Sequence, residues 1–282
     1  MYTNKKKIAI LLAAYNADKY LGEQIDSLIS QTNQDWTLFI RNDGSRDNTS
    51  EIISEYCSKY NNIIEVDRGG ENLGCRNNFF RLLEVVESDY YMFCDADDVW
   101  FNDKIEISLL RMQELELVNF NKPLLVHTDS AIYDIDLNLV AQSFWKTVNI
   151  NPDKFLSFNL ICICCCVGGS TMLLNQKVKD LVFPLENNNL IFDYWIAINT
   201  VKNGVISTIH MPTKKYRQHN SNVCGVTIGE ENSIFNKLKN WKSLFKKYKD
   251  ESDMLKTIGY GSFGKYLFYK FIVILKIRFS KY

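Results

Sequence analysis

The sequence predicts an α/β fold built on a mixed, mainly parallel sheet that is flanked by helices. In the first hundred residues, four apolar runs with strand character alternate with three segments whose apolar residues recur at helical spacing. The composition is that of a globular protein, because 46% of the 282 residues are apolar and 23% are charged. A chain of this length suits one large domain with an appendage.

The elements of the first half follow one another regularly. Strands are expected at residues 8–14, 36–41, 63–66 and 90–94. Helices are expected at residues 18–30, 47–60 and 77–87. Asp47 is the predicted N-cap of the second helix. Because strands alternate with helices, we expect parallel strands joined by right-handed crossovers.

Beyond residue 95 the pattern is less regular and predicts strands of both directions. Further helices are expected at residues 103–117 and about 193–202. Further strands are expected at residues 124–128, 170–174, 205–210 and 215–219. Asp129 follows the first of these strands and faces either a cleft or the interior. The expected organisation is one domain over residues 1–233, with a first half over about 1–100 and a second half over about 101–233.

The charge is distributed unevenly along the chain. Lys and Arg number 33, as do Asp and Glu, so the net charge predicts no nucleic-acid partner. Residues 234–282 nevertheless hold 12 basic and 3 acidic residues, which gives this segment +9 and the first 233 residues −9. Its apolar residues recur at helical spacing and predict a basic amphipathic helical tail that binds an anionic membrane surface. The alternative is a terminal helix that packs on the body and exposes its lysines.

The N-terminus predicts a strand and no export signal. The apolar run at residues 8–14 is short, and no cleavage site of small residues follows it. We therefore expect a cytoplasmic protein, peripheral on the inner face of the cell membrane, whose eight cysteines are reduced thiols. Cys162 and Cys165 have the spacing of a zinc pair, but no second pair accompanies them, so buried apolar thiols are favoured.

Acidic residues gather where predicted strands end. Asp43 closes the second strand, and Asp95, Asp97 and Asp98 follow the fourth. In an open parallel sheet, ligands bind at the carboxyl ends of the strands. Three carboxylates within four residues repel one another unless a cation holds them, and Mg²⁺ or Mn²⁺ on a diphosphate suits this pattern. The alternative is an Asp-rich turn that caps the following helix.

Several segments of the chain together resemble the successive motifs of family 2 glycosyltransferases. The first four are AAYNADKYLGEQIDSLISQT, NDGSRDNTSEII, ENLGCRNNF and YMFCDADDVW. Two later segments, FDYW at 192–195 and YRQHNSN at 216–222, are similar to motifs of bacterial polysaccharide rhamnosyltransferases. The resemblance covers about residues 7–226 and implies an inverting enzyme with the Rossmann-like GT-A fold and a nucleotide-diphosphate-sugar donor.

The resemblance makes residues 1–100 the nucleotide-sugar half and residues 101–233 the acceptor half. It also implies roles for residues of the first half. Ala13 and Tyr15 would line the pocket of the base, and Asp43 would accept a hydrogen bond from a uracil or thymine N–H. Asn72 and Arg76 would help to hold the nucleotide and its diphosphate, for which the donor fork of arginine is suited.

The resemblance also implies a metal site, a base and an acceptor site. Asp95 would face the ribose or the metal, Asp97 would bind Mn²⁺ or Mg²⁺, and His219 would be a third contact to metal or phosphate. Three further residues lie at the start of the second helix predicted in the acceptor half. The first, Asp193, would be the general base. Tyr194 and Trp195 would form an aromatic platform for a sugar ring. An N-cap role for Asp193 is compatible with the same placement.

Three positions depart from the family pattern. Phe192 stands where rhamnosyl enzymes often carry His, Ala96 replaces a Gln, and residues 168–170 replace a Gly-Cys-Thr-like stretch. The expected function is metal-dependent transfer of L-rhamnose from dTDP-rhamnose to a polyprenyl-diphosphate-linked oligosaccharide, in the synthesis of O-antigen, capsule or a similar polysaccharide. The alternatives are a UDP-sugar donor carrying galactose, glucose or N-acetylhexosamine, and a non-catalytic sugar-nucleotide-binding partner of a glycan-assembly complex.

Overall fold

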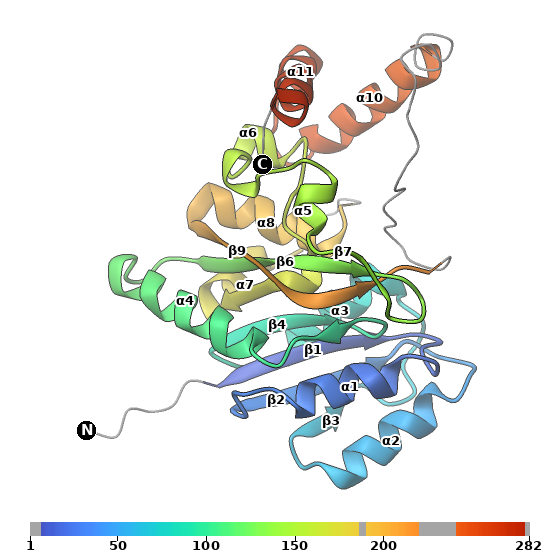
Figure 1. Cartoon of the computed structure of the whole chain (residues 1–282). Coiled ribbons are helices and arrows are strands. Elements are labelled where there is room, and N and C mark those ends of the chain that lie inside the picture. Colours follow the sequence, from blue (N-terminus) through green and yellow to red (C-terminus); the bar gives the residue numbers. More distant parts are fainter. Residues whose placement is uncertain (1–6, 186–189, 220–240, 280–282) are drawn as a thin grey trace.

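The computed structural model describes residues 7–185, 190–219 and 241–279, and these residues form one mixed sheet with helices on both faces (Figure 1). The strands lie in the order β3-β2-β1-β4-β8-β6-β9-β5, and β7 pairs with β6. Their bounds are β1 Ile8–Ala14, β2 Trp36–Asn42, β3 Ile63–Glu65, β4 Tyr90–Asp95, β5 Val99–Trp100, β6 Leu124–Tyr133, β7 Leu139–Ala141, β8 Met172–Asn175 and β9 Val205–Arg217. Most paired residues lie in parallel pairs, so the expected mainly parallel sheet is confirmed.

Helices cover both faces of the sheet, which explains why β1, β4 and β8 are almost entirely apolar. The helices are α1 Leu21–Ile29, α2 Thr49–Lys59, α3 Gly74–Val85, α4 Lys104–Val118, α5 Phe144–Thr147, α6 Phe158–Ile161, α7 Gln176–Val182, α8 Phe192–Asn203, α10 Trp241–Lys256 and α11 Phe263–Phe279, with 3₁₀ turns η1 Pro152–Lys154 and η2 Gly169–Thr171. Alternate residues of β1 illustrate the arrangement. Ile10 and Leu12 pack with α1, α2 and α4, whereas Ala9 and Leu11 pack with α3, α7 and α8.

The predicted elements are present, with two differences of physical interest. Asn48 and not Asp47 occupies the N-cap of α2, although Asp47 Oδ1 still accepts from the Thr49 backbone N–H at 3.1 Å. The expected strands 205–210 and 215–219 are one strand, β9, which contains Pro212. The pairing of β6 with β9 shifts register at this proline, which accommodates its missing N–H.

The two C-terminal helices lie at the α6 and α8 side of the molecule, far from α2 (Figure 1). The inner face of α11 packs on α6 through a small apolar cluster that contains Phe155, Leu160 and Val273. The predicted domain boundary at residue 233 and residues 234–240 lie outside the described residues. Among the helices that are described, none is both long and apolar enough to cross a membrane.

Candidate active site

Parallel pairing brings the ends of β1, β2 and β4 to one edge of the sheet. In the register of these strands Ala13 lies between Arg41 of β2 and Asp95 of β4. Tyr15 follows β1 with 51% of its surface exposed. The predicted base-pocket residues and Asp95, the last residue of β4, therefore share one edge of the sheet.

Asp43 fastens the loop before α3 to the end of β2. Its side chain is 2% exposed, and Oδ1 accepts from the Arg41 guanidinium at 2.6 Å and from the Leu73 N–H at 2.8 Å. Oδ2 accepts from the Gly74 N–H at 2.8 Å, and Asn72 Nδ2 donates to the Asp43 carbonyl at 2.8 Å. These bonds satisfy N–H groups at the start of α3, which explains why the helix begins at Gly74 and three residues earlier than expected.

Arg76 lies in the first turn of α3 and connects it to the segment before α8. Its Nε donates to the Leu190 carbonyl at 2.6 Å, and its guanidinium lies 4.8 Å from the centre of the Phe80 ring. Burial lowers the pKa of this half-buried arginine. In the structure Arg76 thus contacts the acceptor half directly, and its predicted diphosphate contact stays a prediction.

Asp95, Asp97 and His219 meet at the end of β4. His219 Nε2 lies 2.9 Å from Asp97 Oδ2, and the imidazole stacks on Tyr20 with the ring centres 5.2 Å apart. Asp97 is 28% and Asp95 38% exposed, so both carboxylates reach the surface of the edge. Burial and the neighbouring Asp95 raise the pKa of Asp97. Within the described ranges, no group of three or more His, Cys, Asp or Glu side chains has metal-binding geometry.

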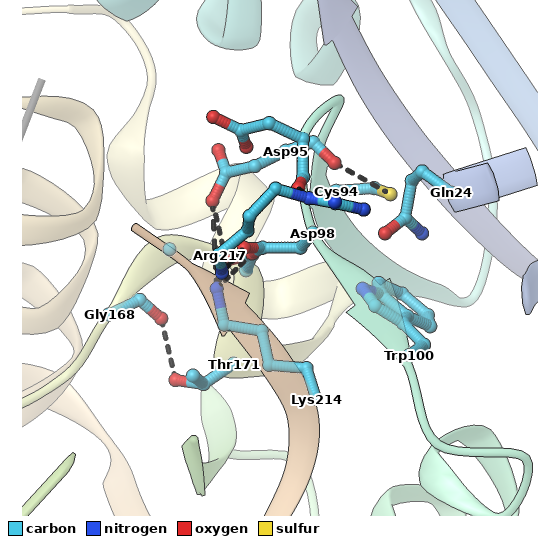
Figure 2. A network of polar contacts seen from close by, with 12 residues as sticks. Gln24, Cys94, Asp95, Asp98, Trp100, Gly168, Thr171, Lys214 and Arg217 are labelled. Atoms are coloured by element: carbon cyan, nitrogen blue, oxygen red, sulfur yellow. Dashed lines mark hydrogen bonds and ion pairs between the residues drawn. The ribbon is translucent and has the colours of Figure 1, made fainter. Parts of the chain in front are cut away.

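Asp98 points away from this edge into a buried polar network (Figure 2). Its carboxylate accepts from Lys214 Nζ and, at 3.2 Å, from the Arg217 backbone N–H. Burial acts to lower the pKa of Lys214, but the carboxylates of Asp98 and Asp95 outweigh burial and raise it, so the ammonium stays charged. Asp98 therefore joins β4 to β9 and is unavailable to a cation at the edge.

The short turn η2 bridges the end of β4 and the start of α8. Ser170 Oγ donates to Asp95 Oδ2 at 2.6 Å and accepts from Lys214 Nζ. Lys104 Nζ donates to the Ser170 carbonyl at 2.8 Å from the other side. The Gly169 N–H then donates to Asp193 Oδ2 at 3.1 Å. Two adjacent residues of η2 thus bind both Asp95 and Asp193, which are almost a hundred residues apart in sequence.

Asp193 occupies the second position of α8, one residue after Phe192, whereas Ile191 is the N-cap. The N-cap alternative is therefore wrong, although Oδ1 accepts from the Tyr194 N–H at 2.7 Å. Burial is the main cause that raises the pKa of Asp193 to about 6, and the Asp95 carboxylate adds to it. Hydrogen bonds from the N–H groups of Tyr194 and Gly169 oppose this shift. A carboxylate with a pKa near neutrality can accept a proton at physiological pH.

Two aromatic residues beside Asp193 differ from expectation. Trp195 is 4% exposed within the core, and its Nε1 donates to the Val182 carbonyl, so the predicted sugar platform at this residue is wrong. Tyr194 is half-buried and donates through its hydroxyl to the Cys162 carbonyl. Phe192 packs directly on Gly169, where an added Cβ would lie 2.3 Å from the ring. Phe192, which replaces the family histidine, thus packs against η2.

Asp129 lies inside β6 and holds the start of α5. Its carboxylate accepts from the Ser143 hydroxyl, the Ser130 N–H at 2.8 Å and the Trp145 N–H at 3.2 Å. Burial raises its pKa. Asp129 also lines an open cavity of about 640 Å³ in the acceptor half, together with Tyr133 and other residues of β6, β7 and β9. Its carboxylate thus has a structural use beside this cavity.

Sequence reasoning missed the residues beneath the edge, namely Lys104, Ser170 and Lys214. Lys104 shares the buried face of α4 with Ser108 and Met112, and this charge on an otherwise interior helical stripe was the available signal. Cys162 and Cys165 accord with the thiol interpretation, since burial raises the pKa of both.

Comparison with known proteins agrees with this geometry. The family model described as glycosyl transferase family 2 matches residues 9–155. This chain belongs to that family. It is 37% identical over 228 residues to a Shigella flexneri protein named dTDP-rhamnosyl transferase RfbG, covering 77% of this chain and 74% of the relative. It is 24% identical to an Escherichia coli UDP-Glc:alpha-D-GlcNAc-diphosphoundecaprenol beta-1,3-glucosyltransferase, WfgD, covering 77% and 79% of the two chains.

Solved structures show the same fold for this glycosyltransferase. Residues 1–349 of S. aureus TarS in complex with UDP-GlcNAc superpose with a TM-score of 0.54 at 18% identity, over 78% of this chain and 62% of TarS 1–349. A Pyrobaculum calidifontis mannosyltransferase, PcManGT, in complex with GDP-Man and Mn²⁺ gives a TM-score of 0.56 at 10% identity, over 99% and 77% of the two chains. The expected GT-A fold is confirmed, and the chain is an enzyme that transfers a sugar.

Proposed function

We propose that this glycosyltransferase moves L-rhamnose from dTDP-rhamnose to a lipid-linked oligosaccharide in the synthesis of a bacterial surface polysaccharide, with inversion at the anomeric carbon. The observation that carries this proposal is the η2 bridge, because Gly169 and Ser170 bind Asp193 and Asp95 at the same time. A carboxylate suited to accept a proton is thereby fixed next to the edge where a nucleotide sugar would bind.

The donor would lie along the ends of β1, β2 and β4. Ala13 and Tyr15 would line the base, and Asp43 would receive a base N–H at Oδ2, because this oxygen accepts from the Gly74 N–H and can accept a second hydrogen bond. Asn72 and Arg76 would bind the nucleotide and its diphosphate. The 37% identity to a protein named dTDP-rhamnosyl transferase supports dTDP-rhamnose as the donor. TarS binds UDP-GlcNAc, which supports a UDP-sugar as the alternative.

The residues of the edge fit a divalent cation. Mg²⁺ and Mn²⁺ need only one or two carboxylates when phosphate oxygens and water complete the shell. Asp97, with Asp95 and His219 beside it, supplies such a partial shell, and both carboxylates are partly exposed. A bound cation would stabilise the negative charge that develops on the departing diphosphate. Asp98 would take no part, since Lys214 and the Arg217 N–H hold its carboxylate.

Asp193 would act as the general base. Its carboxylate would take the proton of an acceptor hydroxyl while that oxygen forms a bond to the anomeric carbon and the bond to the diphosphate breaks. One such displacement inverts the anomeric centre and needs no nucleophile from the enzyme. The Gly169 and Tyr194 N–H groups orient the carboxylate, and burial raises its pKa to about 6.

The donor is tested by thermal shift with dTDP, UDP, GDP, CDP and their sugars, with Mn²⁺ and with EDTA. A ligand that binds only the folded state raises the melting temperature. We expect dTDP and dTDP-rhamnose to stabilise the protein in the presence of the metal, and Asp97→Asn to abolish the metal-dependent part. If UDP-sugars alone stabilise the protein, the donor is a UDP-sugar and the proposal of dTDP-rhamnose is wrong.

The base is tested with Asp193→Asn, which keeps the shape of the side chain. Loss of a general base lowers turnover by about 10²- to 10⁴-fold, whereas donor affinity should change little because the base acts in the transition state. The exposed Asp136→Asn is the matched control and should keep full turnover. Near-normal turnover of Asp193→Asn would assign the base to another residue.

The acceptor and the location of the enzyme are proposed together. A polyprenyl-diphosphate-linked oligosaccharide lies at the membrane surface, so the enzyme would work as a peripheral protein on the inner face of the cell membrane. A second relative, WfgD, is named for a diphosphoundecaprenol-linked substrate, which supports this class of acceptor.

A further inference from the structure

Helix α11 presents a stripe of large apolar side chains to the outside of the molecule. Leu267, Phe268, Phe271 and Ile274 are 37%, 60%, 59% and 47% exposed. Their spacing along the sequence places them on one face of the helix. We call these four residues the outer stripe. Large exposed apolar surfaces of this kind mark sites of interaction.

The opposite face of α11 is fixed to the body, so the outer stripe cannot turn inward. Tyr266 and Val273 are 1% and 4% exposed, and Tyr266 donates through its hydroxyl to Glu251 of α10. Lys270 Nζ lies 3.0 Å from the same Glu251 carboxylate. Asn159 Nδ2 donates to the Tyr269 hydroxyl at 3.0 Å. The helix packs on the body as one alternative expected, but its outer face is apolar and does not consist of exposed lysines.

The charge around the outer stripe identifies the kind of surface that it fits. Residues 241–279 hold nine Lys and Arg against three Asp and Glu, whereas residues 1–233 carry a net charge of −9. Lys276 and Arg278 lie in the last turn of α11, and Lys246 and Lys247 are exposed on α10. An anionic surface would therefore attract this end of the molecule and repel the rest, so that α11 faces the surface.

We propose that α11 docks in the plane of an anionic lipid bilayer, with the outer stripe among the acyl chains and the basic residues of α10 and α11 at the headgroups. Helices that lie in the plane of the interface bind membranes through this combination of apolar burial and attraction to anionic lipid. A second copy of the chain is a poorer partner for the stripe, because two stripes in contact would bring two basic helix pairs together.

The docked orientation would place the base close to the lipid surface. Tyr194, next to Asp193, donates to the Cys162 carbonyl, and Cys164 and Cys166 of the same segment pack against the inner face of α11. Within the part of the chain that the structure describes, this segment thus contacts both the start of α8 and the apolar cluster of α11. A lipid-linked acceptor could then reach Asp193 without leaving the membrane, and this last step alone rests on the proposed function.

The test is co-sedimentation of the full-length protein with vesicles of phosphatidylcholine, with and without phosphatidylglycerol. We expect binding to the anionic vesicles, weakened by salt, and a decrease of at least about tenfold in the triple variant Phe268→Ser, Phe271→Ser and Ile274→Ser. The matched control is Leu117→Ser with Phe120→Ser, two apolar residues of the acidic body that are 85% and 91% exposed. The control should bind as the wild type does.

Three outcomes would overturn the proposal. They are absence of binding by the wild type, equal binding by the triple variant, and a wild-type dimer in analytical ultracentrifugation that the triple variant abolishes. The last result would assign the stripe to a second copy. Unchanged thermal unfolding of the triple variant excludes misfolding as the cause of lost binding. Vesicle binding requires no donor, so a failure here is distinct from a failure of the proposed sugar transfer.

Discussion

Charged side chains at the surface of the site differ in exposure and in bonding partners from those in the layer directly beneath it. At the exposed edge, Asp95 and Asp97 reach the surface and have oxygen atoms to offer. In the buried layer, Asp98 is fully buried, and Lys104 and Lys214 both donate to Ser170 of η2. The run Asp95–Asp98 thus contains both a ligand-facing part and a structural part.

The difference shows that burial and partners assign roles which the residue types do not. A buried ion pair is weak evidence for stability, because desolvation of the two charges offsets their attraction. The role of the buried pair here is to position neighbouring elements of the fold. Lys214 binds Asp98 and Ser170 at once, so it sets the places of β9 and η2 relative to β4. The exposed edge can then present its carboxylates at a fixed separation from Asp193.

The largest effect that distinguishes the two regions is expected from Lys214→Met. This change leaves the Asp98 carboxylate buried without its cation, which costs about 3–5 kcal/mol of unfolding free energy and lowers the melting temperature by roughly 10 °C. Asp97→Asn at the exposed edge should change the melting temperature little and abolish metal-dependent donor binding. Thermal unfolding with and without donor and Mn²⁺ measures both.

A double variant sharpens this first test. Lys214→Met combined with Asp98→Leu removes both charges and should recover much of the stability that Lys214→Met loses, because no unpaired buried charge remains. A single variant Lys214→Met that unfolds like the wild type would show that the pair does not hold β9. Strong destabilisation by Asp97→Asn would show that the exposed edge, like the buried layer, has a structural role.

An intermediate effect is expected from Gly169→Ala. A Cβ at Gly169 would lie 2.3 Å from Phe192, so η2 or α8 must shift, at a cost of about 1–3 kcal/mol. Because a displacement near 1 Å at a reacting group can reduce turnover by about a hundredfold, activity should fall more than stability does. Gly168→Ala is the control, since its Cβ would meet only Thr171, at 3.8 Å. Equal activity of the two variants would contradict the positioning role of η2.

The exposed edge could be predicted from the sequence, and the buried layer could not. Strand-end aspartates such as Asp95 and Asp97 can be predicted because strand ends follow from local periodicity and parallel strands end at a common edge. The contacts of Lys104 and Lys214 with Ser170 join three segments from different parts of the chain, and no local pattern determines which segments meet. Trp195 was misassigned for the same reason, because its burial depends on where α8 packs.

The smallest effect concerns the charge on Asp193, which belongs to neither region and depends on both. Because burial raises its pKa to about 6, the folded protein favours the protonated form. That contribution to stability is fully present below pH 4 and is lost as the pH rises through 6. The melting temperature of the wild type should therefore fall, by a few degrees relative to Asp193→Asn, between pH 4 and 7. Turnover should rise over the same interval, because the base must lose its proton before it can act.

The wild type and Asp193→Asn share all other titrating groups, so the difference between their melting temperatures isolates Asp193. A difference that stays constant with pH, combined with turnover that is flat through pH 6, would show that Asp193 has an ordinary carboxyl pKa and that η2 holds a carboxylate already ionised.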